Sequence, residues 1–177
     1  MTALIAIIIA ILFIVIIYNS LVAKRNKVDE IFSTMDSVLK KRYDLIPNLV
    51  VAAKEYMNFE KEVLEKVTEL RSKAVEANAT ADEKIHISDQ ISGFIRNFRI
   101  AFENYPNLKA NENIMHLQRS LNEIEEQIAA ARRAYNASVL DYNNACDMFP
   151  TNIFALSFGF KKEITLKCQK AKEQILT

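Results

Sequence analysis

Two histidines and two cysteines are the side chains of this chain best suited to hold a metal or to do redox chemistry. Glu83 and His86 have the Glu-x-x-His spacing with which helical bundles ligate a di-iron centre. The other histidine, His116, has its glutamate four residues before it, which is the wrong spacing. Cys146 and Cys168 lie too far apart for a CxxC motif. We therefore expect no catalytic residue, no metal, no cofactor, and two reduced thiols.

The composition predicts that long helices position these side chains. The 177 residues include only two glycines and three prolines, the residues that most often interrupt helices and strands, so we expect few and long elements. Half of the residues are apolar and a quarter are charged, which is typical of amphipathic helices. The net charge is +1, so no basic field indicates a nucleic-acid partner.

The first 23 residues carry no charged side chain, and residues 2–18 are almost wholly apolar. As a helix, residues 2–18 would rise about 26 Å, and continuation to Ala23 gives about 33 Å, enough for a ~30 Å hydrocarbon core. Tyr18 would then lie at the lipid interface. A cleaved signal peptide is the alternative, but it needs a basic start and a small-residue cleavage site, and neither is present. We expect a retained membrane anchor.

Basic residues flank only the carboxyl side of this segment, as Lys24, Arg25 and Lys27. The positive-inside rule predicts an N-terminus outside the cell and a soluble part in the cytoplasm. Small residues at Thr2, Ala6 and Ala10 share one face of the anchor. Such faces favour close helix contact, so we expect a homo-oligomer in the bilayer.

Four long helices are expected after the anchor. The first continues from it, and Asp44 with Pro47 predicts a break and a new helix start. Thr80 to Glu83 is a capping-box pattern that opens the third helix. Asn111 is the expected N-cap of the fourth helix, which Pro150 ends. Short connections make successive helices antiparallel, so the predicted fold is an all-α antiparallel bundle.

The fourth helix has the clearest apolar repeat in the chain. Two heptad rows predict coiled-coil-like packing: Leu117, Ile124, Ala131, Ser138 and Ala145 in one, and Leu121, Ile128, Tyr135, Tyr142 and Phe149 in the other. Polar residues also occupy buried-face positions of the bundle, namely Arg42, Glu60, Tyr135 and Tyr142. We interpret these four as a hydrogen-bonded layer that fixes helix register, with a ligand or partner site as the alternative.

The C-terminal segment is rich in phenylalanine and lysine. Residues 151–177 hold five lysines and two glutamates, a net charge of +3. Antiparallel helices would return this segment to the bilayer, where it would lie in the interface and bind lipid. The residues expected there are Phe154, Leu156, Phe158, Phe160, Lys161 and Lys162. The alternative is that Ile153, Leu156 and Phe160 fold back to cap the core of the bundle. The expected organisation is an anchor at 1–23, a bundle at 24–150 and a basic amphipathic segment at 151–177.

Four blocks, in order along nearly the whole chain, resemble the LemA family. They are Tyr18-Asn19-Ser20-Leu21-Val22 with Arg25-Asn26, the run from Arg42-Tyr43-Asp44 through Ile46-Pro47-Asn48, Tyr105-Pro106-Asn107 through Asn111 with Leu117-Gln118, and Arg133-Ala134-Tyr135-Asn136 with Tyr142-Asn143, Phe149-Pro150 and Phe158-Gly159-Phe160. Ile114, Ser120 and the tail beyond Phe160 depart from the family pattern.

The resemblance implies a bacterial membrane helix with a helical bundle, no established enzymatic activity, envelope-associated roles and membrane-protein partners. Some relatives act at magnetosome membranes. Two hypotheses follow. The first is a non-enzymatic membrane-anchored scaffold or adaptor that self-associates and organises the membrane or an unknown partner protein. The second is a regulatory or ligand-sensing bundle that signals through its anchor.

Overall fold

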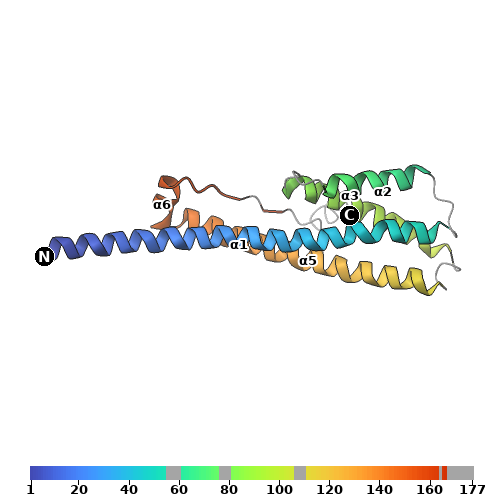
Figure 1. Cartoon of the computed structure of the whole chain (residues 1–177), viewed down its shortest axis with the longest axis horizontal. Helices are drawn as coiled ribbons and strands as arrows, with labels where there is room; N and C mark the ends of the chain where they lie inside the picture. Colours follow the sequence, from blue (N-terminus) through green and yellow to red (C-terminus); the bar gives the residue numbers. More distant parts are fainter. Residues whose placement is uncertain (55–60, 76–80, 106–110, 164, 167–177) are drawn as a thin grey trace, which may run out of the picture. The chain divides into compact units, whose positions relative to one another are not determined.

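The computed structural model describes residues 1–54, 61–75, 81–105, 111–163 and 165–166, and these form helices and connecting segments without a strand (Figure 1). The helices are α1 (Thr2–Ala53), α2 (Lys61–Val75), α3 (Ala81–Glu103), α5 (Glu112–Asp147) and α6 (Thr151–Ser157). The all-α prediction is therefore confirmed. Five residues named in the sequence analysis lie outside the described residues, namely Glu60, Thr80, Pro106, Asn107 and Cys168.

Helix α1 is longer than expected, because the break predicted at Asp44 and Pro47 does not occur. The helix passes through Pro47 and ends at Ala53. A proline inside a helix removes one hydrogen bond and costs about 3 kcal/mol in an isolated helix. Around it, however, Ile46, Leu49, Val50 and Ala53 are all buried, and this packing outweighs the local cost. Leu49 and Ala53, which the apolar pattern assigned to a second helix, thus belong to α1.

The start of α5 agrees with its predicted N-cap. The side-chain oxygen of Asn111 accepts hydrogen bonds from the backbone N–H groups of Asn113 (3.0 Å) and Ile114 (3.2 Å). These are the second and third residues of the helix, whose N–H groups have no partner within the helix itself.

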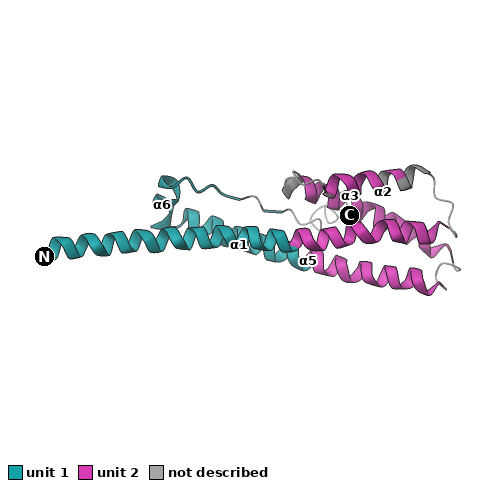
Figure 2. Ribbon diagram, viewed as in Figure 1, with its two compact units in different colours: residues 1–34, 130–177 teal, residues 35–129 magenta. Residues whose placement is uncertain are grey.

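The described contacts divide the chain into two units, residues 1–34 with 130–177, and residues 35–129 (Figure 2). Helices α1 and α5 each contribute to both units. This division follows packing, and the division into anchor, bundle and tail stays a prediction. Each unit is described here by itself.

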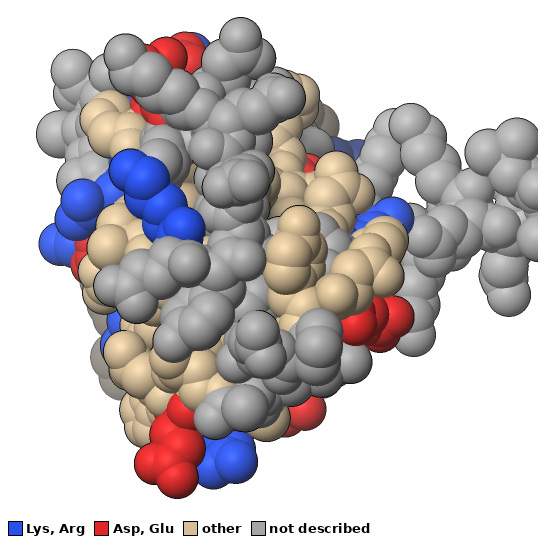
Figure 3. All heavy atoms as spheres, turned by 90° about the vertical axis from the view of Figure 1, so that its right-hand side faces the viewer, with Lys and Arg blue, Asp and Glu red and all other residues tan. Residues whose placement is uncertain are grey.

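The unit at 35–129 is an antiparallel arrangement of four helical segments (Figures 1 and 2). Polar side chains join three of the helix pairs. Asp44 of α1 binds Arg71 of α2 at 2.9 Å, Asp36 of α1 binds Lys84 of α3 at 2.8 Å, and Arg99 of α3 donates to Asn122 of α5. Between these helices lies an apolar core that includes Met35, Leu39, Ile46, Leu70, Ile91, Ile95, Phe98, Phe102, Leu121 and Ile128. At the end seen in Figure 3, the described charged side chains of both signs are interspersed among uncharged ones.

The unit at 1–34 with 130–177 begins with unpacked helix. Every residue from 1 to 16 is exposed, and burial begins at Ile17, followed by Leu21 and Val28. From there α1 lies against α5: the rings of Phe32 and Tyr135 are 5.9 Å apart, and Lys24 binds Asp141 at 2.5 Å. Most of the expected apolar segment, up to residue 16, is thus left uncovered by the other described residues.

One heptad row of α5 is buried as expected, and the other shifts along the helix. Leu121, Ile128, Tyr135 and Tyr142 are buried, but Phe149 is 81% exposed because α5 ends two residues before it. In the second row Ile124 is buried, whereas Ser138 and Ala145 are only half-buried. The fully buried positions there are one residue later, at Val139 and Cys146. A helix of 3.6 residues per turn drifts against a seven-residue repeat, which accounts for the shift.

Replacing Pro47 by alanine should stabilise the protein. Pro47→Ala restores the missing helical N–H and removes the ring, so we expect the free energy of unfolding to rise by about 1–3 kcal/mol. Thermal and urea melts of the full chain in detergent, followed by circular dichroism, measure this change. Val51→Ala, at an exposed position of the same helix, is the control and should shift stability by no more than about 0.5 kcal/mol. A loss of stability in Pro47→Ala would contradict the prediction.

Candidate membrane-proximal site

An aromatic cluster forms where the uncovered part of α1 ends. The ring of Tyr18 meets Phe158 and Phe160 edge-on, with centroids 5.2 and 5.9 Å apart. The guanidinium of Arg25 lies 5.6 Å from the centre of the Phe160 ring. Edge-to-face pairs and cation–π contacts each contribute about 0.5–1.5 kcal/mol beyond simple burial. Four residues expected at the lipid interface from the sequence therefore meet in one place.

The turn after α6 brings the two phenylalanines to Tyr18. The N–H of Phe160 donates to the carbonyl of Ala155 (2.9 Å), and the N–H of Gly159 donates to that of Leu156 (3.3 Å). This is a Schellman-type helix end, which requires a left-handed residue. Gly159 supplies it with φ +73°, a conformation that residues with a side chain rarely adopt.

Beyond this turn, residues 160–163 and 165–166 form a segment, here called the strap, that two asparagines of α5 hold by its backbone. Asn143 donates to the carbonyl of Glu163 (2.9 Å) and accepts from its N–H (3.0 Å). Asn136 makes the same two bonds with Leu166, at 2.9 and 2.8 Å. Each side-chain amide thus pairs with both polar groups of one residue, as a neighbouring β-strand would.

The spacing of these asparagines matches the spacing of the residues that they hold. Seven residues along a helix rise about 10.5 Å, and three residues of extended chain cover about 9.9 Å. Asn136 and Asn143 are seven apart, and Glu163 and Leu166 are three apart. Sequence reasoning assigned no role to the two asparagines, although both lie in the blocks that resemble the LemA family. Their shared heptad position was the available signal.

Tyr142 adds a further contact between α5 and the strap. Its hydroxyl donates to the carbonyl of Lys161 at 2.9 Å. Burial raises the pKa of Tyr142 to about 12, and a hydrogen bond with Cys146 adds to the rise. The phenol therefore stays protonated, and able to donate, at any physiological pH. Tyr142, which the sequence analysis assigned to a hydrogen-bonded layer, thus binds the strap.

The residues expected in the C-terminal interface occupy different environments. Phe154 and Phe160 are half-buried, whereas Leu156 and Phe158 are exposed. Lys161 is exposed, and Lys162 binds Asp147 at 2.9 Å. Ile153 and Leu156, which a cap over the bundle core would bury, are both exposed. Phe160, the third residue of that alternative, is half-buried, and Leu166 of the strap is buried.

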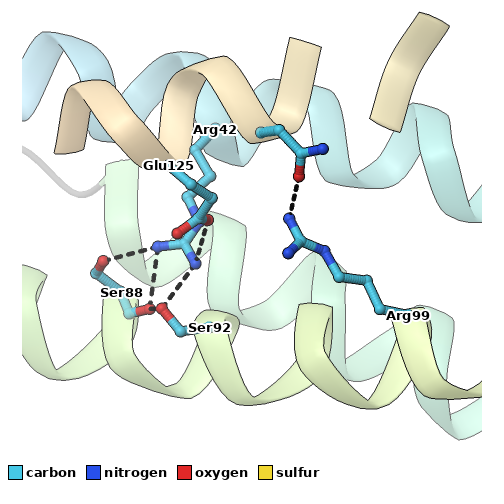
Figure 4. Close-up of polar contacts among 6 residues, drawn as sticks. Arg42, Ser88, Ser92, Arg99 and Glu125 are labelled. Carbon is cyan, nitrogen blue, oxygen red and sulfur yellow. Dashed lines mark hydrogen bonds and ion pairs between the residues drawn. The ribbon is translucent and has the colours of Figure 1, made fainter. Parts of the chain in front are cut away.

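Arg42 is fully buried, and a polar layer surrounds it in the unit at 35–129 (Figure 4). Its Nη1 donates to the hydroxyl (3.0 Å) and carbonyl (3.3 Å) of Ser88, and its Nη2 donates to the hydroxyl of Ser92 (2.7 Å). Nη2 also lies 2.8 Å from a carboxylate oxygen of Glu125. A buried charge needs hydrogen-bond partners and a counter-charge. Because α3 and α5 supply them to Arg42 of α1, the layer joins these three helices.

Sequence reasoning found Arg42 but not its partners. Arg42 is seven residues from both Met35 and Leu49, so it occupies a position that is otherwise apolar. Ser88 and Ser92 are four apart on α3, next to the buried residues Ile87 and Ile91, and this was the available signal. Tyr135 is buried against Phe32 in the other unit.

The remaining predicted residues lie apart from these clusters. Thr2, Ala6 and Ala10 are exposed on the unpacked part of α1. Lys24 is bound to Asp141, and Lys27 is bound to Glu30 at 3.0 Å. Among the described residues, no group of three acidic, histidine or cysteine side chains could hold a metal ion.

Removing the carboxylate of the Arg42 layer should destabilise the protein. Glu125→Ala leaves the buried guanidinium without its counter-charge, and we expect about 1–3 kcal/mol less stability. Replacing both partners, as Arg42→Met with Glu125→Met, removes the buried charge itself and should restore stability to within about 1 kcal/mol of the wild type or above it. Chemical denaturation measures both variants, with the exposed Glu126→Ala as control. A double variant as unstable as Glu125→Ala would contradict this account.

Releasing the strap should expose its lysines to protease. Asn136→Leu with Asn143→Leu removes four hydrogen bonds, so trypsin cleavage after Lys161 or Lys162 should become at least about ten-fold faster. Mass spectrometry of the fragments over time measures the rate. The matched control is Asn144→Leu, an exposed asparagine next to Asn143. Equal cleavage of the double variant and the control would show that the amides do not hold the strap.

Comparison with known proteins shows which family the chain belongs to. The model of the LemA family matches residues 31–176. The chain is 28% identical over 137 residues to Protein LemA of Metamycoplasma hominis, covering 77% of this chain and 63% of that protein. Over 60 residues it is 35% identical to Magnetosome protein MamQ of Magnetospirillum gryphiswaldense and 37% identical to Magnetosome protein MamQ 2 of Paramagnetospirillum magneticum. Each of these matches covers 34% of this chain and 22% of the relative. This chain belongs to the LemA family.

Proposed function

We propose that this protein is a non-enzymatic, membrane-anchored scaffold or adaptor that self-associates and organises membrane or partner proteins at the bacterial envelope. The observation that carries the proposal is the state of α1. It contains a window of mean hydropathy 2.9, long and apolar enough to cross a membrane, and its first 16 residues pack against nothing in the described chain. A soluble protein would bury such a surface.

The polar features of the chain support binding and positioning more than chemistry. The strap is held through backbone hydrogen bonds, the aromatic cluster through ring edges, and Arg42 through hydroxyls and a carboxylate. Such contacts fix the arrangement of segments and surfaces. The magnetosome proteins among the relatives add support for an organising role at a membrane.

The proposed topology places the N-terminus outside and the helices beyond Ala23 in the cytoplasm. Lys24 and Arg25 follow the apolar segment directly, and basic residues are retained on the cytoplasmic side of the inner membrane. Self-association would use the small-residue face of Thr2, Ala6 and Ala10, which is exposed along the anchor.

Crosslinking in native membranes tests the self-association. Bulky side chains on the small face, as Ala6→Ile with Ala10→Ile, should lower the yield of crosslinked oligomers at least about five-fold, because they separate the two backbones. The control, Ile8→Leu with Leu12→Ile, changes the opposite face at constant volume and should keep the wild-type yield. A wild-type protein that crosslinks only as a monomer, or that alkaline carbonate releases from membranes, would contradict the proposal.

One observation favours the alternative of a ligand-sensing bundle. An open hollow of about 340 Å³ lies in the unit at 35–129, and α1, α3 and α5 line it with as many polar side chains as apolar ones. The residues lining it include Leu49, Phe98, Phe102, Leu121, Arg99 and Asn122. A small molecule that co-purifies at stoichiometric amounts from detergent-solubilised membranes would support sensing over scaffolding.

A further inference from the structure

We propose that α6 holds the protein to the same bilayer that α1 crosses, through an apolar patch made of Met148, Phe149, Ile153 and Leu156. This inference rests on the proposed membrane anchoring. The four side chains are 62%, 81%, 53% and 84% exposed, and they lie within nine residues of one another. Their occupant is the boundary between lipid headgroups and acyl chains, where short amphipathic elements bind.

The position of α6 along α1 places the patch at that boundary. Phe158, the residue directly after α6, contacts Tyr18, and burial along α1 begins at Ile17 (Figure 1). The uncovered helix from residue 2 to residue 16 rises only about 22 Å, whereas the hydrocarbon core is about 30 Å thick. The bilayer therefore reaches past Tyr18, to the level at which α6 is attached. Apolar side chains at that level complete the thickness that the anchor alone does not fill.

The other face of α6 is fixed to the protein, which leaves the patch free to meet lipid. Ala155 is buried, and the hydroxyl of Thr151 donates to the carbonyls of Ala145 (2.5 Å) and Met148 (2.7 Å) at the end of α5. Phe158 and Phe160 rest on Tyr18. The element is therefore two-faced, with one side docked on α1 and α5 and the other presenting large apolar side chains.

Basic groups lie next to the patch in the same unit. Arg25 stacks on Phe160, and Lys161 is exposed directly after it. These cations are placed where anionic headgroups of the cytoplasmic leaflet would be. The position of these cations agrees with a patch that enters the bilayer from the anionic cytoplasmic leaflet.

Tryptophan fluorescence provides the test, because the natural chain contains no tryptophan. Single variants Leu156→Trp and Phe149→Trp place the probe in the patch, Ile8→Trp places it in the anchor, and Leu140→Trp places it on an exposed site of α5. The full chain is reconstituted in phosphatidylcholine–phosphatidylglycerol vesicles with or without bromine on the acyl chains. Circular dichroism confirms that each variant keeps its helix content.

Brominated lipid should lower the emission of the two patch variants at least about two-fold and leave Leu140→Trp nearly unchanged, since bromine quenches only on contact within the bilayer. Aqueous iodide should show the opposite order. If iodide quenches the patch variants as strongly as Leu140→Trp, the patch lies in water and the inference is wrong. If neither agent quenches them, a protein surface covers the patch and the inference is equally wrong.

The anchor variant separates the two proposals. Quenching of Ile8→Trp by brominated lipid, without quenching of either patch variant, would leave the membrane anchor intact and overturn only the role of α6. An unquenched Ile8→Trp would overturn the proposed anchoring, and the inference would fail with it.

Discussion

The physical constraint on which the structure depends is the solvent of residues 1–16. These residues are apolar, lie in one continuous helix and have no neighbour in the described chain to cover them. Water would order around such a surface at a free-energy cost that grows with its area. A helix is also the one single-segment structure that satisfies its own backbone in lipid. Apolar surface must be kept from water in both parts of the chain. Residues from Ile17 onward bury it by packing, whereas residues 1–16 do not.

Beyond residue 16 of α1, polar contacts decide how the other segments are arranged. Apolar rows alone would allow helices to slide by a turn, since Leu, Ile and Val are similar neighbours. Arg42 permits one register, the one that brings Ser88, Ser92 and Glu125 within reach. In the other unit, Tyr142 and the two asparagines define where the strap lies on α5. Each unit thus combines an unspecific apolar core with a few specific polar bonds.

The sequence predicted what depends on long-range averages and missed what depends on single contacts. Few glycines, a continuous apolar start and a heptad repeat were enough for the all-α class, the long apolar helix at the start of the chain and the buried row from Leu121 to Tyr142. Pro47 misled, because its local cost is read easily while the burial of Ile46 and Val50 around it is not. Phe149 misled because a repeat does not show where its helix ends. The roles of Asn136 and Asn143 were missed, because their shared heptad position does not show that a segment 20 to 30 residues later returns to them.

The backbone pairing of the strap determines which changes that part of the chain tolerates during evolution. Two amides read the main chain of Glu163 and Leu166 and make no use of the side chain of Glu163, which points to solvent. Many residue types can therefore replace one another at such a position without loss of either bond. A deletion of one residue, in contrast, would move the partners by about 3.3 Å and reverse the faces of the extended chain. We therefore expect evolution to constrain the length of this segment more than its composition.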